Sequence, residues 1–283
     1  MRASSLLALL ATLVACGDKS VDSKGPELLA GDYEILNARD IDDLRQRGGE
    51  AYAIGGSLLI FGSAVEDLSG LENLTRIGRS LEIRFNSRLT SLRGLEGLVS
   101  VGDSLVDTGI RISPLENPSN KSQHVIEGLI VTDNPVLASL AGLDSLQFVG
   151  GGLSLISNEA LTGLDHLGSL TRVRGSVDVI ANPALVGLTG LLRLERIEGY
   201  LEVRGNPLIS SLRGLEHLST VEGDLIVWFN DGLTSLDGLQ GLETVGGPLT
   251  IDRNPQLPQE QVLAFVDSLI ARGYEGETIL GPE

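Results

Sequence analysis

The stretch that decides the fold is LEVRGNPLISSLRGL, residues 201–215. A short alternating apolar run, Leu201 and Val203, ends at Asn206-Pro207, and leucine or isoleucine then recurs at every third position. Alternation is typical of a strand with one buried face, whereas an α-helix needs apolar spacings of three and four in turn. The stretch therefore predicts a short strand followed by bends.

The same arrangement repeats every 24 residues along most of the chain. Stepping from Asn206 in both directions meets asparagine at seven of eight positions, the exception being Ile110: Asn86, Asn134, Asn158, Asn182, Asn206, Asn230 and Asn254. Columns of leucine and then of β-branched residues follow each of them. A fixed period predicts that every repeat forms one coil of constant length, the coil around Ile110 included. One earlier coil, with the strand SLLIFG at 57–62, is a residue out of register.

The asparagine column has a physical reason. Where the backbone turns out of a strand, some N–H and C=O groups leave the ladder, and a buried amide can satisfy them because it both donates and accepts. Stacked amides also bond to one another along a solenoid. We therefore predict a ladder of buried asparagines along one inner corner.

Both ends of the repeat carry helical patterns. DIDDLRQRG, residues 40–48, is acidic at its start and basic at its end, as the helix dipole favours. Residues 258–273 begin with Pro258, end at Gly273, and place Val262, Phe265, Val266, Leu269 and Ile270 on one face. We predict caps over the apolar ends of the solenoid, with a partner-binding amphipathic helix as the alternative for the second.

The fold class that follows is mainly β: a right-handed parallel β-solenoid of about nine 24-residue coils with short helical caps at both ends. The pattern GxLxIxxNPxLxSLxGLxxLxxV resembles the receptor L-domain family, which is related to leucine-rich repeats. The resemblance runs from about Tyr33 to the C-terminus and implies a binding or recognition module for a protein, peptide or glycan. The chain differs from many members of that family in having no cysteines at the ends of the repeat.

The N-terminal residues have the layout of a secretory signal. Residues 1–15 carry one positive charge, Arg2, followed by an apolar run too short to span a bilayer. Leu13-Val14-Ala15-Cys16 resembles the lipobox of bacterial lipoproteins, which implies that fatty acyl chains such as palmitate would anchor Cys16 in the membrane of a bacterial envelope. A cleaved soluble signal is the alternative. Residues 16–31 are expected to form a flexible tether, and 32–283 the solenoid.

Composition excludes several kinds of protein. A net charge of −17 would repel nucleic-acid phosphates, so we expect no nucleic-acid partner. The single cysteine excludes an intramolecular disulfide and a cysteine-built metal site. Because the chain contains no P-loop, dinucleotide glycine fingerprint, HExxH or GxSxG motif, we expect no cofactor, no metal and no catalytic activity.

Outward strand positions are the candidate binding residues. Counting back from successive asparagines places Ile156, Ile180, Arg204 and Trp228 side by side, with Ile226 and Phe229 nearby. An exposed apolar strip with a Trp beside an Arg is a common interaction anchor. The alternative is that another layer or molecule covers the strip. Phe85 shares a column with Phe229, which favours a packing role for these two.

A second outward grouping is acidic. Asp178 and Glu202 are expected on neighbouring strands, a like-charge pairing that is normally destabilising. It is compatible with a cation site or with the acid and base of a carbohydrate-active enzyme, although Arg204 can neutralise the pair. The sequence thus predicts a lipid-anchored recognition module, with a structural envelope protein and a carbohydrate-active enzyme as alternatives.

Overall fold

A computed structural model describes residues 26–103 and 127–281 of the chain. It confirms a mainly β fold, a parallel β-solenoid of about eight turns with two α-helices. The predicted signal segment, the lipidation site Cys16 and Ile110 lie outside the described residues.

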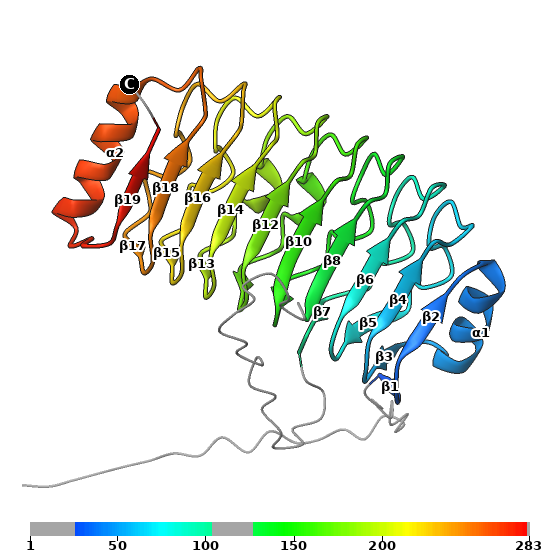
Figure 1. Ribbon diagram of the computed structural model, residues 1–283. Helices are drawn as coiled ribbons and strands as arrows, with labels where there is room; N and C mark the ends of the chain where they lie inside the picture. Colours follow the sequence, from blue (N-terminus) through cyan, green and yellow to red (C-terminus); the bar gives the residue numbers. More distant parts are fainter. Residues whose placement is uncertain (1–25, 104–126, 282–283) are drawn as a thin grey trace, which may run out of the picture.

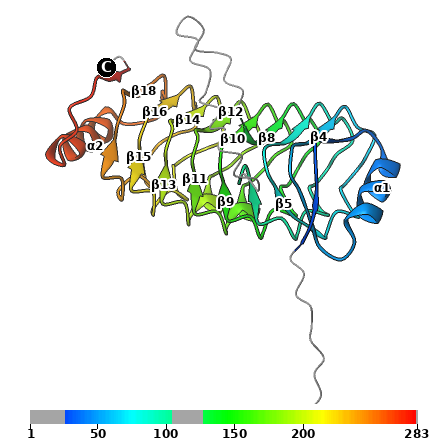
Figure 2. The same ribbon diagram turned by 90° about the horizontal axis from the view of Figure 1, so that it is seen from below.

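Two parallel sheets run along the solenoid (Figure 1). The ten-stranded sheet contains β2 (Tyr33–Ile35), β4 (Leu58–Phe61), β6 (Leu81–Arg84), β8 (Gly128–Thr132), β10 (Gly152–Ile156), β12 (Val177–Ile180), β14 (Leu201–Arg204), β16 (Leu225–Trp228), β18 (Leu249–Asp252) and β19 (Thr278–Leu280). The nine-stranded sheet contains β1 (Glu27–Leu29), β3 (Tyr52–Ile54), β5 (Leu74–Ile77), β7 (Ser100–Val101), β9 (Phe148–Val149), β11 (Arg172–Val173), β13 (Arg196–Ile197), β15 (Thr220–Val221) and β17 (Thr244–Val245). Figure 2 shows the strands of the two sheets on opposite sides of the coil.

The leucine columns fill the space between the sheets. In the coil that begins at Asn182, Leu185, Leu188, Leu191 and Leu194 are all fully buried, and the corresponding leucines of neighbouring coils stack on them. Burying a leucine side chain contributes about 1.5–3 kcal/mol, so this bore is the main source of stability.

The asparagine ladder is present as predicted. The ladder asparagines are fully buried except for Asn254 at the C-terminal end, which is 9% exposed. In a typical rung, Asn182 Oδ1 accepts the backbone N–H of Asn158, while Asn182 Nδ2 donates to the carbonyl oxygens of Leu155 and Ile180 at 2.9 and 3.1 Å. The Asn182 amide therefore satisfies backbone groups on the preceding coil and on its own.

The ladder also extends one rung further than the sequence indicated. Ser63 occupies the asparagine position of the first complete coil, where its backbone N–H and hydroxyl donate to Asn86 Oδ1 at 2.8 and 2.7 Å. The period there is 23 residues, since Leu58 pairs with Leu81. At this end of the ladder a hydroxyl stands in place of the amide and donates to Asn86.

The prediction that residues around Ile110 form a stacked coil is wrong. β6 pairs directly with β8, with Leu81 opposite Leu129, and β7 pairs with β9. Asn86 accordingly donates to Asn134 Oδ1 through both its backbone N–H and its Nδ2, at 3.1 and 3.0 Å. Among the described residues, no strand of the ten-stranded sheet is inserted between β6 and β8, which explains why the turns number about eight.

The two predicted caps are present at opposite ends of the solenoid (Figure 1). Helix α1 (Ala38–Gly48) begins with a capping box, in which Asn37 accepts a backbone N–H and Asp40 accepts the N–H of Asn37. Helix α2 (Gln259–Ala271) buries Val262, Val266 and Leu269. Ile270, predicted on the same face, is instead 54% exposed. Neither helix is long and apolar enough to cross a membrane.

Two strands at the ends differ from the sequence prediction. Residues 27–29, predicted within the tether, form β1 and pair with β3, and β19 beyond α2 was not predicted.

The bend after each ladder asparagine takes two forms. Gly94, Gly142, Gly214 and Gly238 have positive φ, but Gly190 and His166 at the same position do not, because their bends are short 3₁₀ turns, η2 (Thr189–Leu191) and η1 (Asp165–Leu167). Gly190 is still required, because a Cβ would lie 1.6 Å from the carbonyl oxygen of Leu164.

Candidate recognition surface

The predicted apolar strip is assembled in register on the ten-stranded sheet. Ile156, Ile180, Arg204 and Trp228 are the last residues of β10, β12, β14 and β16, and each is paired with the next. All four are half-buried. We call this row, with Ile226 on β16 and Phe229 after it, the outer strip. It lies beside the asparagine corner, two residues before the buried ladder.

An aromatic stack stands at the C-terminal end of the outer strip. The Trp228 and Phe229 rings stack with centroids 4.7 Å apart and an angle of 28° between their planes. The Arg253 guanidinium lies 4.9 Å from the Phe229 centroid and 6.0 Å from that of Trp228. Such cation–π contacts contribute about 0.5–1 kcal/mol at exposed sites. The stack is therefore held in one orientation.

Phe85 and Phe229, for which a packing role was expected, are both partly exposed to solvent. Phe85 is 52% exposed and Phe229 39% exposed. Both occupy the residue before a ladder asparagine, where φ is positive, 57° for Phe85 and 55° for Phe229. This left-handed corner turns the side chain away from the bore, so the two phenylalanines share a column because they share a bend, and both rings reach the surface.

Polar groups on the strip are only partly matched. Arg204 Nε lies 2.8 Å from Glu202 Oε1, close enough for an ion pair although without hydrogen-bond geometry. Trp228 Nε1 is buried and makes no hydrogen bond to any described residue. A buried donor without an acceptor costs about 1–3 kcal/mol.

Part of the outward face is not accessible. Ile130 on β8, Ser154 on β10 and Asp178 on β12 point away from the bore, yet they are 2%, 1% and 4% exposed. Asp178, predicted at an outward position, is therefore not on an open surface. On β10 and β12 the row nearest the asparagine corner, Ile156 and Ile180, stays half-exposed, whereas Thr132 in the same row on β8 is only 8% exposed.

Asp178 and Glu202 do lie on neighbouring strands, in register. Asp178 accepts a hydrogen bond from Ser154 Oγ at 3.2 Å, and its charge adds to burial in raising the pKa of Tyr200. Burial raises the pKa of Glu202; Arg204 lowers it and Asp178 raises it again. A carboxyl held protonated more readily than usual suits a general acid. However, Asp178 is almost completely buried, so the pair offers a substrate one accessible carboxyl.

A second aromatic pair was not predicted from the sequence. Phe61 at the end of β4 and Phe85 after β6 meet edge to face, with ring centroids 5.4 Å apart. Phe61 stands two residues before Ser63, which is the position of the outer strip relative to the ladder. This correspondence was hidden in the sequence because that coil has a period of 23 residues rather than 24. This pair lies on the same corner as the outer strip, toward the N-terminal end.

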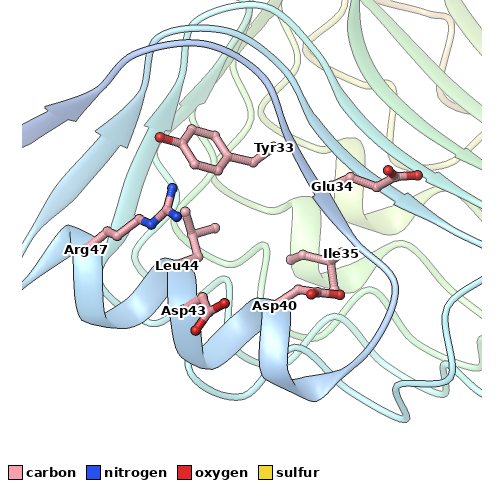
Figure 3. A pocket seen from close by; sticks show the side chains of 7 residues that line it. All are labelled: Tyr33, Glu34, Ile35, Asp40, Asp43, Leu44 and Arg47. Carbon is pink, nitrogen blue, oxygen red and sulfur yellow. The ribbon is translucent and has the colours of Figure 1, made fainter.

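A small pocket lies elsewhere, between β2 and α1 (Figure 3). It is lined by Tyr33, Glu34, Ile35, Asp40, Asp43, Leu44 and Arg47. Asp40 is already engaged, because its Oδ2 accepts the backbone N–H groups of Leu36 and Asn37. The pocket therefore belongs to the structure of the cap. Among the described residues, no group of three or more His, Cys, Asp or Glu side chains is arranged to hold a metal ion.

Comparison with known proteins adds no identification. No family model matches the chain, and no curated protein matches it either. The geometry of the outer strip is consequently the basis on which a function is proposed.

Proposed function

We propose that this chain is a lipid-anchored recognition module of a bacterial envelope, without catalytic activity, that binds a protein, peptide or glycan through the outer strip. The observation that carries the proposal is the in-register row Ile156, Ile180, Arg204 and Trp228, half-exposed on a rigid sheet. Side chains fixed at strand spacing lose little freedom when they meet a ligand, so little of the binding energy is spent on ordering the receptor.

The chemistry of the row supports binding. Trp and Arg are enriched among the interface residues whose replacement by alanine costs the most binding free energy. The half-buried Trp228 ring and the isoleucines Ile156 and Ile180 offer apolar area. The resemblance to receptor L-domains agrees with such a role and remains part of the proposal.

Trp228→Ser tests the binding site. Purified wild-type protein, Trp228→Ser and the control Val186→Ser would be compared on arrays of glycans and displayed peptides. Val186 is 61% exposed and lies outside the strip, so its replacement removes exposed apolar area of the same kind. We expect a ligand bound by wild type and Val186→Ser and lost by Trp228→Ser. A structural envelope protein would show no ligand, and equal binding by all three proteins would contradict the site.

The anchor is tested separately. Cys16→Ala is expected to move the protein from the membrane fraction to the soluble fraction, because a stable anchor needs acyl chains on that residue. The mass of the mature N-terminus should show the added fatty acids. An unmodified Cys16 in protein found only in the soluble fraction would contradict the anchor. The recognition surface would then belong to a secreted protein.

The carbohydrate-active alternative has its own test. Glu202→Gln would abolish turnover of a glycan substrate if Glu202 were an acid or nucleophile, whereas a binding module has no turnover to lose. We expect no glycan cleavage by either protein.

A further inference from the structure

The pocket between β2 and α1 contains charged groups that the cap does not use. Asp40 caps the helix, but Asp43 and Arg47 also line the pocket, and neither side chain makes a hydrogen bond or ion pair with any residue that the structure describes. Figure 3 shows the Arg47 guanidinium beside Leu44 and the Tyr33 ring, with Asp43 one turn earlier on the same helix. One pocket thus presents a cation and an anion that are not paired with each other.

The edge of the sheet adds two backbone groups. β2 is the last strand of the ten-stranded sheet, and the Tyr33 N–H donates to the carbonyl oxygen of Ser57 at 2.8 Å, so the Tyr33 backbone faces β4. Backbone groups of successive residues point to opposite sides of a strand. The N–H and C=O of Glu34 therefore point to the free edge, on the side where α1 lies (Figure 1). No described residue bonds to them.

The size and floor of the pocket limit what it can hold. Its volume is about 150 Å³, which is the space of about five water molecules and less than a drug-sized ligand needs. Ile35 and Leu44 are buried at the base, and the Tyr33 ring is half-buried beside them. The pocket therefore suits a small molecule with a short apolar part.

The charges decide which small molecule fits best. The exposed carboxylates of Asp43 and Glu34 outnumber the one guanidinium of Arg47, so a ligand with negative charge alone is repelled. A ligand with positive charge alone leaves Arg47 without a partner. A molecule with one group of each sign satisfies both sides of the pocket, and charge-assisted hydrogen bonds are the strong ones.

We propose that this pocket binds a free α-amino acid with a short apolar side chain. Its carboxylate is held by the Arg47 guanidinium and the N–H of Glu34. Its ammonium group is held by the Asp43 carboxylate and the C=O of Glu34. Its side chain packs on Leu44 and Ile35. The proposal goes beyond the recognition function and does not rest on it, because the outer strip begins at β10 whereas this pocket lies at the N-terminal cap.

The test is a calorimetric titration of the full-length chain with L-alanine, L-valine and L-leucine, and with two blocked forms of valine. N-acetyl-L-valine has no ammonium group, and L-valinamide has no carboxylate. We expect at least one of the three free amino acids to bind. Each blocked form should bind about tenfold or more weakly than L-valine, because it loses one charge-assisted contact. Equal binding of L-valine and L-valinamide would overturn the proposal.

Variants assign each contact to its residue. Arg47→Gln should weaken L-valine about tenfold and leave L-valinamide unchanged, whereas Asp43→Asn should weaken L-valine and leave N-acetyl-L-valine unchanged. Arg39→Gln is the matched control, because Arg39 is exposed on α1 and does not line the pocket. Circular dichroism checks that α1 remains folded in all three variants.

Two results would contradict the site. One is the absence of binding by any of the three amino acids, and the other is binding that survives both Arg47→Gln and Asp43→Asn. Trp228→Ser should bind L-valine as the wild type does. Loss of the amino-acid site would therefore leave the outer strip as the recognition surface, and an outer strip without a ligand would leave the amino-acid site.

Discussion

The asparagine corner and the outer strip lie two residues apart in every coil, yet they differ completely in regularity. At the ladder position, every coil from Asn86 to Asn254 in the described residues has asparagine. At the strip position the same coils have Arg84, Thr132, Ile156, Ile180, Arg204, Trp228 and Asp252. The ladder residue must satisfy fixed backbone groups, whereas the strip residue meets no such requirement. The difference indicates that the inner corner is constrained by the fold, whereas the fold leaves the outer strip open to variation, as the proposed recognition role requires.

The largest effect is expected from the bore that supports both regions. Leu188→Ala should lower the free energy of unfolding by about 2–5 kcal/mol, because Leu188 is fully buried and its loss leaves a cavity. Leu192→Ala, at a leucine that is 45% exposed, is the matched control. Urea unfolding of the two variants gives the comparison. Similar losses of unfolding free energy in the two variants would mean that the repeat position of a leucine does not determine whether it is buried in the bore.

The ladder itself comes next. Asn182→Leu should cost about 1–3 kcal/mol, because the carbonyl of Leu155 and the N–H of Asn158 lose their partners. Ser210→Leu places the same side chain at an exposed position and should have little effect. Equal melting temperatures for the two variants would refute the role of the buried amide.

The aromatic pair outside the ladder should matter less for stability. Phe85→Ser removes the edge-to-face contact with Phe61, which contributes about 0.5–1.5 kcal/mol, and creates no cavity in the bore. Thermal unfolding measures the change. A loss as large as that of Leu188→Ala would place Phe85 in the core after all and would favour the packing role predicted from the sequence.

The smallest effect concerns Glu202 and depends on pH. Because its pKa is raised in the folded protein, chiefly by burial, ionisation destabilises the fold as pH rises past 4.5, the usual value for Glu. Glu202→Gln removes this penalty but also the ion pair with Arg204. The free energy of unfolding of Glu202→Gln, taken relative to wild type, should therefore be higher at neutral pH than well below pH 4.5, by less than about 1 kcal/mol. Urea unfolding at both pH values measures it, and the opposite sign would contradict the burial of Glu202.

The sequence was sufficient to predict the ladder and the bore. Each ladder asparagine and each inward leucine is dictated by its own coil, so the period alone locates it. The same reasoning placed Ile156, Ile180, Arg204 and Trp228 in one row, since strand pairing fixes that order.

Features that depend on departures from the period were not predictable. The period continues through Ile110, but β6 pairs with β8 directly, because a strand pairs with whichever neighbour offers a matching ladder. The Phe61–Phe85 contact was hidden by the short coil between them. The burial of Ser154 and Asp178 depends on what lies over the outer face, and no periodic pattern within the strands encodes that.

The bond between Asn86 and Asn134, residues 48 apart in the chain, has a consequence for how such molecules change size. Its geometry matches that of bonds between asparagines 24 apart, so two ladder asparagines can stack in the same way whatever length of chain separates them. A protein built this way can gain or lose whole units, or carry long excursions between them, while neighbouring units keep their contacts. The length of the solenoid would then change in steps of one strand, about 4.8 Å at a time.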